Sequence, residues 1–444
     1  MSARTLSVET VSKVGGEVVI MGWVNARRNM GKIVFLDIRD RAGIVQVVGV
    51  PSQMDSVSVE KMKDVRPEWV LEIKGTVQER GAKQKNPNSP TGAVELLIKE
   101  LKVLASAETL PLDLEDEKIG LDIHLDYLPI TLRSERWRDV FKVQETIIQS
   151  FREALASEQF TEFQSPVLAG GDAEGGAAVF SVDYFYNQKA SLATSPQLYK
   201  QIMTGVFERV FTTAKVFRAE KSATTRHLSE ITQMDFEMGF IKDQYDVMAM
   251  LETVIKHIVA RVIAKHEEVF KKRGVALPLA PEKFPALKLH EAQDILGVPH
   301  GADIEPEQER AICEWAKKER HSDFVFITHY PTAGRAFYTM SDEGELSRGF
   351  DLLFRGVEIN SGAQRIHSYE DLVARMKERG LNPEKFAFYL EAFKFGMPPH
   401  GGCSTGLERI TARLLEIPNI KETALFPRDL NRIDLQLSPP EYKQ

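Results

Sequence analysis

Two apolar runs joined by a charged loop place the strongest constraint on the fold of this chain. The first run, residues 210–217, leads into Arg218 and Glu220. A short polar loop then carries Arg226 and His227, and the second run contains two carboxylates. Guanidinium groups bind a phosphate or carboxylate in one orientation, and a glutamate accepts a hydrogen bond from an amine. The pattern predicts a strand, loop and strand that hold a charged ligand, or a surface hairpin with solvated ion pairs.

A glycine-rich stretch far downstream, residues 401–406, precedes a helical pattern that carries Arg409. Glycines let a backbone come close to a ligand, and the free N–H groups of a helix N-terminus favour anions. Alone, such a turn is a weak indication, because most glycine-rich turns only reverse the chain. Together, the two stretches resemble motifs 2 and 3 of the class II aminoacyl-tRNA synthetases, and the surrounding residues resemble the aspartyl and asparaginyl branch.

Short alternating strands dominate the N-terminal part, at residues 18–24, 33–39, 43–48, 69–77 and 93–101. Five such strands with glycine and proline turns predict a small closed barrel of the OB type. A barrel of this kind binds single-stranded nucleic acid through stacked aromatic and basic side chains. The candidates for that face are Phe35, Arg27, Arg28, Lys32 and Arg39. The alternative is a β domain that serves only as an interaction module, with Phe35 in its core.

The chain divides by pattern into three parts. We predict the barrel over residues 1–104, an acidic, proline-punctuated hinge over residues 105–135 and a catalytic domain over residues 136–444. Apolar residues recur at helical spacing over residues 137–160 and 243–273. By the resemblance, the third part is a class II catalytic domain with an antiparallel sheet flanked by helices, so the expected fold class is multidomain α/β.

Composition bears on the compartment and the partners. Cys313 and Cys403 are the only two cysteines, which excludes a disulfide framework and indicates a reducing compartment. Residues 1–10 lack the apolar core of a signal peptide, and no stretch has the ~18 apolar residues of a membrane span. We therefore expect a cytoplasmic protein without a membrane partner. The net charge of −7 neither favours nor excludes nucleic acid, because a local basic face decides that question.

The resemblance implies a pocket for L-aspartate. Glu174 lies beside two glycines, and the stretch of residues 195–200, with Gln197 and Lys200, matches the aspartyl family closely. Alone, these residues would be a helix cap and a solvated helix face. In the family the corresponding residues line the amino-acid pocket, and an arginine there recognises the β-carboxylate of the substrate. The implied set is Glu174, Gln197, Lys200, Arg218, Asp235, Ser361 and Arg365.

Glu358 and Ser361 supply oxygen ligands of the kind that Mg²⁺ prefers. Strand alternation would put them on opposite faces, so they can share a metal only if the backbone bends, which we place at Gly362. Without the resemblance, Glu358 and Arg365 would be a cross-strand ion pair. The resemblance implies the metal role, with Arg218 and Arg409 as catalytic residues. It also implies an ATP site of Arg218, Glu220, Arg226, His227, Leu228, Glu358, Gly406, Leu407, Glu408 and Arg409.

The implied activity is the ATP-dependent attachment of L-aspartate to tRNA(Asp) through an aspartyl adenylate. In the family a phenylalanine stacks on the central anticodon base and a glutamine eleven positions later reads its edge, as Phe35 and Gln46 are spaced here. Arg27, or its neighbour Arg28, would help to hold the anticodon. The helix over residues 137–160 would form a homodimer interface, although packing inside its own domain is the commoner use of such a helix.

Several observations leave alternatives open. The distance between the two motifs is too short for a large inserted domain, so the chain resembles the compact archaeal type. Ile231 stands where many relatives carry an aromatic residue, Arg335 replaces a usual lysine, and Asn25 stands where some relatives that reject tRNA(Asn) carry tryptophan. Charging of tRNA(Asn) therefore stays open. An asparaginyl-tRNA synthetase, a tRNA-independent asparagine synthetase without a barrel, and a non-catalytic paralogue that binds nucleic acid are the alternatives.

Overall fold

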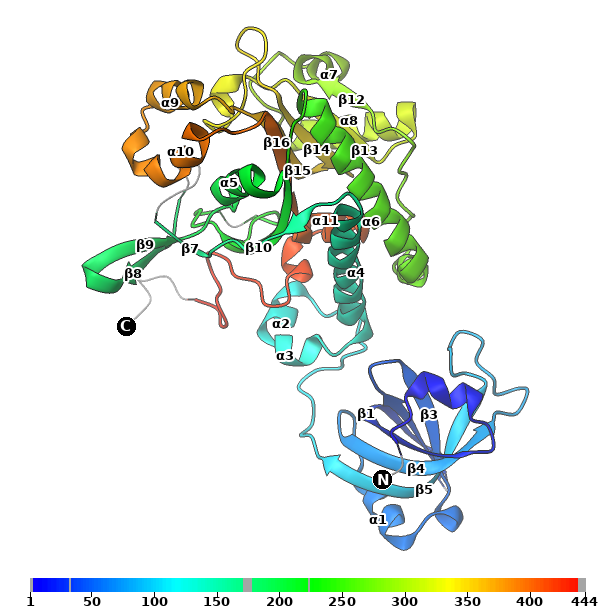
Figure 1. Ribbon diagram of the computed structural model, residues 1–444. Helices are drawn as coiled ribbons and strands as arrows, with labels where there is room; N and C mark the ends of the chain where they lie inside the picture. The colour runs from blue at the N-terminus through cyan, green and yellow to red at the C-terminus, as the bar shows by residue number, and fades with distance from the viewer. Residues whose placement is uncertain (1–2, 32, 171–177, 223, 438–444) are drawn as a thin grey trace. The chain divides into compact units, whose positions relative to one another are not determined.

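Alternating apolar residues close the N-terminal part into a five-stranded barrel in the computed structural model (Figure 1). The strands follow the order β1-β2-β3-β5-β4 and comprise β1 (Glu17–Asn29), β2 (Val34–Arg39), β3 (Ile44–Gly49), β4 (Val70–Glu79) and β5 (Val94–Ala105). Inward side chains such as Leu36, Val47 and Leu71 are completely buried. The predicted OB-type barrel is confirmed. Phe35 is half-buried on the outer face, and therefore does not belong to the core.

The structure describes residues 3–31, 33–170, 178–222 and 224–437, and it divides into two units, Met1–Asp113 and Leu114–Gln444. Lys32 and Glu174, two of the predicted binding residues, lie outside the described residues. Within the described ranges, every helix is too short or too polar to span a bilayer.

An eight-stranded sheet forms the centre of the second unit, in the order β12-β13-β14-β15-β16-β11-β10-β6. Its six middle strands are antiparallel, as predicted, whereas the two edge strands pair in parallel. The strands are β6 (Thr161–Glu162), β10 (Arg209–Phe217), β11 (Glu230–Gly239), β12 (Ala286–Lys288), β13 (Phe324–Thr328), β14 (Gly349–Phe354), β15 (Val357–Arg365) and β16 (His400–Gly406). A three-stranded sheet adds β7 (Leu168–Ala169), β8 (Ser181–Tyr184) and β9 (Gln188–Leu192).

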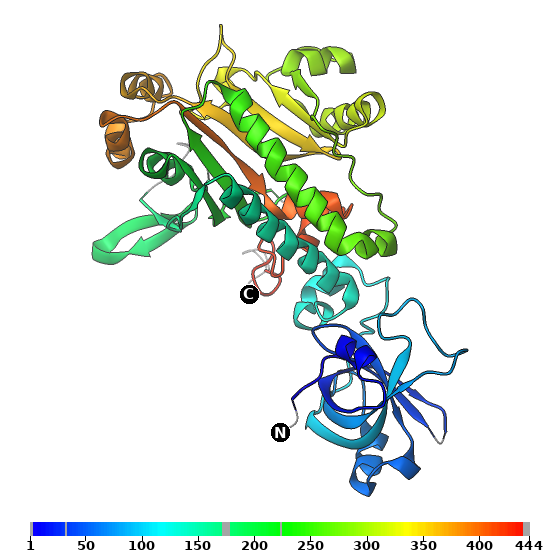
Figure 2. The same ribbon diagram turned by 45° about the vertical axis from the view of Figure 1, so that its right-hand side comes forward.

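Two long helices cover one face of the large sheet (Figures 1 and 2). The helices α4 (Glu135–Ser157) and α6 (Gln244–Arg273) pack on the strands through a core that includes Ile147, Leu251 and Phe236. Both helices were predicted from their apolar spacing and are confirmed. The apolar stripe of α4 packs within its own domain.

One helix, α1 (Ser56–Asp64), belongs to the barrel unit and packs beside β5. The remaining helices belong to the second unit. They are α2 (Leu121–Asp126), α3 (Leu128–Thr131), α5 (Gln197–Phe207), α7 (Leu289–Leu296), α8 (Pro306–Arg320), α9 (Tyr369–Glu378), α10 (Ala387–Lys394) and α11 (Leu407–Leu414). Because α4 and α6 occupy one face of the sheet, the polar side chains of the central strands are left to line the other face.

Gly362 is required by close packing inside the sheet. A Cβ atom at this position would lie 2.4 Å from Cζ of Phe350 and 2.6 Å from Cβ of Cys403. Both neighbours belong to the buried core beneath β15 and β16. From the sequence we predict a different role for Gly362, namely a bend in the strand.

We expect Gly362→Ala to lower the free energy of unfolding by about 1–3 kcal/mol, because the added methyl group overpacks this core. The measurement is urea unfolding of the variant and of a control, Gly205→Ala. At Gly205 in α5 a Cβ would meet Met397 at 3.4 Å, an ordinary contact, and alanine favours the helix by up to ~1 kcal/mol. Equal unfolding midpoints for the two variants would contradict this account of the core.

Candidate functional site

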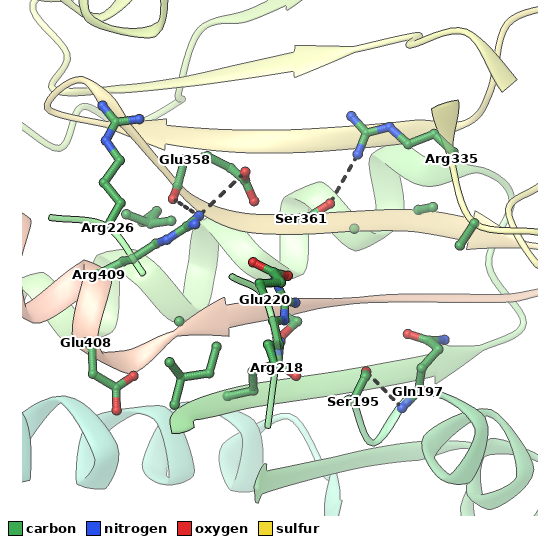
Figure 3. Close-up of a pocket in the computed structure, with 18 of the residues that line it drawn as sticks. Ser195, Gln197, Arg218, Glu220, Arg226, Arg335, Glu358, Ser361, Glu408 and Arg409 are labelled. Carbon is green, nitrogen blue, oxygen red and sulfur yellow. Dashed lines mark hydrogen bonds and ion pairs between the residues drawn. The ribbon is translucent and has the colours of Figure 1, made fainter. Parts of the chain in front are cut away.

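The face of the large sheet opposite α4 and α6 holds a cavity of about 350 Å³. Figure 3 shows Arg226 and Arg409 at one end of it and Ser195 and Gln197 at the other. Most of the predicted binding residues line this cavity. These are Gln197, Lys200, Arg218, Glu220, Arg226, His227, Leu228, Glu358, Ser361, Arg365, Gly406, Glu408 and Arg409.

Two predicted residues are placed differently. Leu407 is buried in the core at the start of α11 rather than in the cavity wall. Asp235 lies just below the cavity floor, where it accepts hydrogen bonds from Lys200 Nζ (2.8 Å) and Ser404 Oγ (2.8 Å). Asp235 therefore holds in place two side chains that line the cavity.

Strand alternation brings distant segments onto the same face. On β11, Met234 and Phe236 point into the helix-covered core, so Asp235 and Glu237 point to the cavity side. On β16, Cys403 packs in the same core, and its neighbour Ser404 faces the cavity. The alternating pattern of each strand thus separates the core from the binding face.

A bulge in β15 puts Glu358 on the same face as Ser361. The pairing with β14 shifts between Leu352 opposite Asn360 and Leu353 opposite Glu358, so Ile359 is the extra residue. The prediction of a bend at Gly362 is wrong, because Gly362 pairs regularly with Phe350. Sequence alternation alone cannot locate a bulge, since the extra residue has no fixed composition.

A buried network of four charged side chains lies at the end of the cavity where the resemblance predicts the amino-acid pocket. Arg365 donates to Glu237 Oε1 (2.9 Å), and Lys200 Nζ lies 3.4 Å from Glu237 Oε2 and 2.8 Å from Asp235 Oδ2. Each of the four side chains is at most 6% exposed. Burial alone raises the pKa of Glu237, but the charges of Arg365 and Lys200 outweigh burial and hold that pKa below its usual range.

Glu237 is the main site residue that the sequence analysis missed. Alternation puts Glu237 on the same face as Asp235, two positions earlier, but nothing in the neighbouring sequence indicates a buried cationic partner for it. The glycine-rich strand contained the missing signal. A Cβ on Gly402 would lie 2.2 Å from Glu237 Oε2, so glycine is needed there to admit this carboxylate. The carbonyl oxygen of Gly402 also accepts a hydrogen bond from Arg365 (2.8 Å).

The predicted phosphate-binding arginines differ in whether they already make hydrogen bonds within the protein. Arg226 donates to Glu309 (2.7 Å) and Arg409 donates to the carbonyl oxygen of Glu358 (2.9 Å). The half-buried Arg218 side chain has no hydrogen bond or ion pair to any residue that the structure describes. As far as the described residues go, Arg218 can therefore turn to a ligand without giving up a hydrogen bond or an ion pair.

A metal would find few protein ligands. Among the described residues, no three His, Cys, Asp or Glu side chains gather closely enough to form a metal site of their own. Burial and then the nearby Asp351 raise the pKa of Glu358 to about 7, although 36% of its side chain is exposed in the cavity. Mg²⁺ commonly takes one or two protein carboxylates, with waters and substrate phosphates completing its shell. Glu358 and Ser361 fit that sparse arrangement.

Arg335, which stands where the resemblance leads us to expect lysine, lies beside Ser361 and Asp351. Its guanidinium forms two hydrogen bonds with Asp351 (3.0 and 2.6 Å) and donates to Ser361 Oγ (3.2 Å) (Figure 3). It also stacks on Tyr330, 3.7 Å from the ring centre. A lysine could not make the planar pair and the stacking together. Arg335 therefore supplies a fixed positive charge beside Glu358.

On the barrel, Phe35, Gln46 and Arg28 lie on one face. Arg28 pairs with Phe35 across β1 and β2 and donates to Gln46 (3.1 Å). Arg27 lies on the opposite face of β1, and its guanidinium reaches the carbonyl oxygen of Lys63 (3.4 Å). Of the two arginines that the sequence offered, Arg28 is the one beside Phe35 and Gln46.

Comparisons with known proteins give consistent matches. Residues 120–430 match the family model of tRNA synthetases class II (D, K and N), and residues 18–104 match that of the OB-fold nucleic acid binding domain. An aspartate-tRNA(Asp/Asn) ligase of Thermus thermophilus is 42% identical over 97% of this chain and 99% of its own. An aspartate-tRNA(Asp) ligase of Pyrococcus abyssi is 38% identical over 94% and 96%. The solved asparaginyl-tRNA synthetase of Pyrococcus horikoshii with asparaginyl-adenylate superposes with a TM-score of 0.90, at 30% identity over 98% of this chain and 100% of its own.

Proposed function

The chain belongs to the class II tRNA synthetases of the D, K and N group, and from this premise we propose that it attaches L-aspartate to tRNA with ATP as the energy source. The observation that carries the choice of aspartate is the buried arginine, Arg365, at the amino-acid end of the cavity beside Lys200. A guanidinium donates to either oxygen of a second carboxylate, whereas the NH2 group of an amide would meet it donor to donor. The names of the relatives support the same choice.

In the first step, an oxygen of the aspartate α-carboxylate attacks the α-phosphorus of ATP. The bond from that phosphorus to the bridging oxygen breaks, and pyrophosphate leaves with aspartyl adenylate remaining. Such a transfer depends on positioning and on charge neutralisation. Arg218 would hold the carboxylate and the α-phosphate, and Arg226, His227 and Arg409 would hold the outer phosphates. In the second step, a terminal ribose hydroxyl of tRNA attacks the adenylate carbonyl, and AMP leaves.

The rest of the cavity supports the two substrates. Glu220 would accept from the adenine amine, and Arg409 would cover one face of the base while Ile231 contacts it without aromatic stacking. Gln197, Lys200 and Arg365 would orient the amino acid. Mg²⁺, held by Glu358 and Ser361, would neutralise the phosphates when bound, and Arg335 adds a charge beside it.

Aminoacylation by the purified protein tests this proposal. Labelled aspartate and asparagine are each offered with ATP, Mg²⁺ and separate preparations of tRNA(Asp) and tRNA(Asn). We propose that both tRNAs accept aspartate. Asn25 on the barrel accepts a hydrogen bond from Arg39 (2.7 Å), and its side chain is smaller than the tryptophan expected in relatives that reject tRNA(Asn). Aspartate on tRNA(Asp) alone would contradict that extension, and attachment of asparagine would instead make the protein an asparaginyl-tRNA synthetase, as the structural match allows.

The barrel would read the anticodon, with Phe35 stacking on a base and Gln46 meeting its edge. We expect Phe35→Ala to reduce kcat/KM for tRNA charging by about 10-fold or more, since a stacked base contributes about 1–3 kcal/mol. ATP–pyrophosphate exchange measured without tRNA should stay at the wild-type rate. Phe35→Tyr keeps the ring and is the matched control. An equal loss in the exchange assay would show that Phe35 acts on the fold instead.

We further propose a cytoplasmic homodimer. The two cysteines of the chain, Cys313 and Cys403, are buried and unpaired, as in proteins of a reducing compartment. Exposed aromatic side chains gather at the turn between β8 and β9, where Phe185 is 72% and Tyr186 94% exposed. An apolar surface of this kind is typical of an interface. Light scattering of the purified protein measures the oligomeric state directly.

A further inference from the structure

A second cavity, of about 600 Å³, adjoins the candidate ATP site. Arg226, Arg409 and Ile420 line both cavities, so these three side chains form a shared wall. The other walls come from α8, from the turn between β14 and β15, and from α11 with the segment that follows it. The second cavity therefore lies behind the end of the first one where Figure 3 shows Arg226 and Arg409.

Positive charge predominates around this cavity. Three carboxylates contribute to its walls, namely Glu314, Asp323 and Glu416. Six basic side chains do so, namely Arg226, Arg310, Lys317, Arg355, Arg409 and Arg413. Arg355 uses two of the carboxylates, because it lies 3.0 Å from Asp323 and 3.4 Å from Glu416. Two more cations are paired outside the lining, Arg226 with Glu309 (2.7 Å) and Arg409 with Glu358 (3.6 Å). The other three basic side chains have no carboxylate partner among the described residues.

Two of the cations are left for a ligand. Neither Arg310 nor Lys317 has a hydrogen bond or ion pair with any residue in the described part of the chain. They stand seven positions apart on α8, with Cys313 and Glu314 between them, so all four lie on one helix face and meet the cavity. Both charged groups can therefore extend over an anion without breaking a hydrogen bond or ion pair to a described residue.

Like charges are crowded deeper in the cavity. The guanidinium of Arg413 donates to the carbonyl oxygen of Ile417 (2.7 Å). Burial, and then the neighbouring charge of Arg226, lower the pKa of Arg413, and Arg355 adds to the effect. A bound anion would relieve this repulsion, since an opposite charge favours the charged form of a group.

We propose that this cavity is a second polyphosphate site, which takes pyrophosphate as it leaves the active site. The inference rests on the proposed function, in which pyrophosphate is released against Arg226 and Arg409, the shared wall. Several guanidinium groups around one space suit an anion with several phosphate oxygens. Among the described residues, none that lines the cavity is aromatic, so it offers no stacking surface for a base.

The test measures binding of ³²P-labelled pyrophosphate by equilibrium dialysis. The protein is first saturated with ATP and Mg²⁺ in the absence of any amino acid, so that the first site is filled and no turnover occurs. One additional pyrophosphate per chain is expected. No additional pyrophosphate would overturn the proposal.

The variant that isolates the site is Arg310→Gln/Lys317→Gln. Glutamine keeps Cβ and Cγ of Arg310, the side-chain atoms beside Gly356, and removes the charged group. The expected result is a loss of roughly 10-fold or more in pyrophosphate affinity, because two charge-assisted contacts disappear. Lys318→Gln, on the next position of α8 with its side chain 84% exposed, is the matched control and should bind as the wild type does. Unchanged affinity in the double variant would overturn the proposal.

Two further outcomes separate the explanations. If two molecules of ATP bind per chain and the double variant loses one, the site takes the polyphosphate tail of a nucleotide, and pyrophosphate is overturned as its occupant. If ATP does not bind at all, the proposed function fails. Titration with pyrophosphate in the absence of ATP then tests the second site separately. The double variant should bind one pyrophosphate fewer per chain than the wild type does, and equal numbers would refute the proposal.

Discussion

Arg218→Ala is expected to reduce ATP–pyrophosphate exchange by about 10³-fold, because it removes the proposed bridge between the reacting carboxylate and the α-phosphate. The loss should fall on the reaction and not on the fold. The Arg218 side chain has no partner among the described residues, and its backbone N–H, which donates to the carbonyl oxygen of Ser229 (2.9 Å), is unchanged by the substitution. The free energy of unfolding should therefore stay within about 0.5 kcal/mol of the wild type.

Two further variants give this prediction its controls. Arg218→Lys keeps the charge but loses the planar fork, so an intermediate rate is expected. Lys215→Ala, on β10 three positions before Arg218, removes only an exposed ion pair with Glu230 (3.4 Å) and should exchange at the wild-type rate. Near-normal exchange by Arg218→Ala would refute its assignment, and a lowered stability would show that its role is structural.

Regular patterns in the sequence predict most of the fold. The barrel strands and the helices α4 and α6 follow from apolar residues at periods of two and of three to four, because burial on one face enforces those spacings. The placement of Arg218 and Arg409 in one cavity could not be derived from periodicity, since nothing local brings segments so far apart in sequence together. Only the resemblance to a known family predicted that the two arginines share a site. The structure gives the reason, because β11 and β16, the strands next to these two segments, pair with each other.

The parts of the site that were not predicted depend on irregular or buried structure. The bulge at Ile359 moves Glu358 to the face of Ser361, and no residue type marks it. Glu237 appears in the sequence as one of two carboxylates on an alternating strand, and only the three-dimensional structure shows that it neutralises both Arg365 and Lys200. Buried ion pairs of this kind depend on contacts between strands that are distant in the sequence, and a local sequence pattern holds no information on such contacts.

Arg365→Gln is expected to have two separable effects. First, the free energy of unfolding should fall by about 3–5 kcal/mol, because the completely buried Glu237 loses its principal cationic partner at 2.9 Å. Second, preference for aspartate over asparagine in the exchange reaction should fall on the order of 10⁴-fold, since the group that complements the second carboxylate is gone. Thermal unfolding measures the first effect, and kcat/KM for each amino acid measures the second.

The double variant Arg365→Gln/Glu237→Gln distinguishes the two roles. With both members of the pair neutral, no uncompensated carboxylate remains in the core, and Lys200 keeps its contact with Asp235 (2.8 Å). The double variant should therefore be more stable than Arg365→Gln alone, a non-additive result typical of neighbouring residues. Aspartate preference should not return, because the recognising charge is still absent. Recovery of both stability and preference would mean that Arg365 serves only to neutralise Glu237 and that another cation, such as Lys200, selects the substrate.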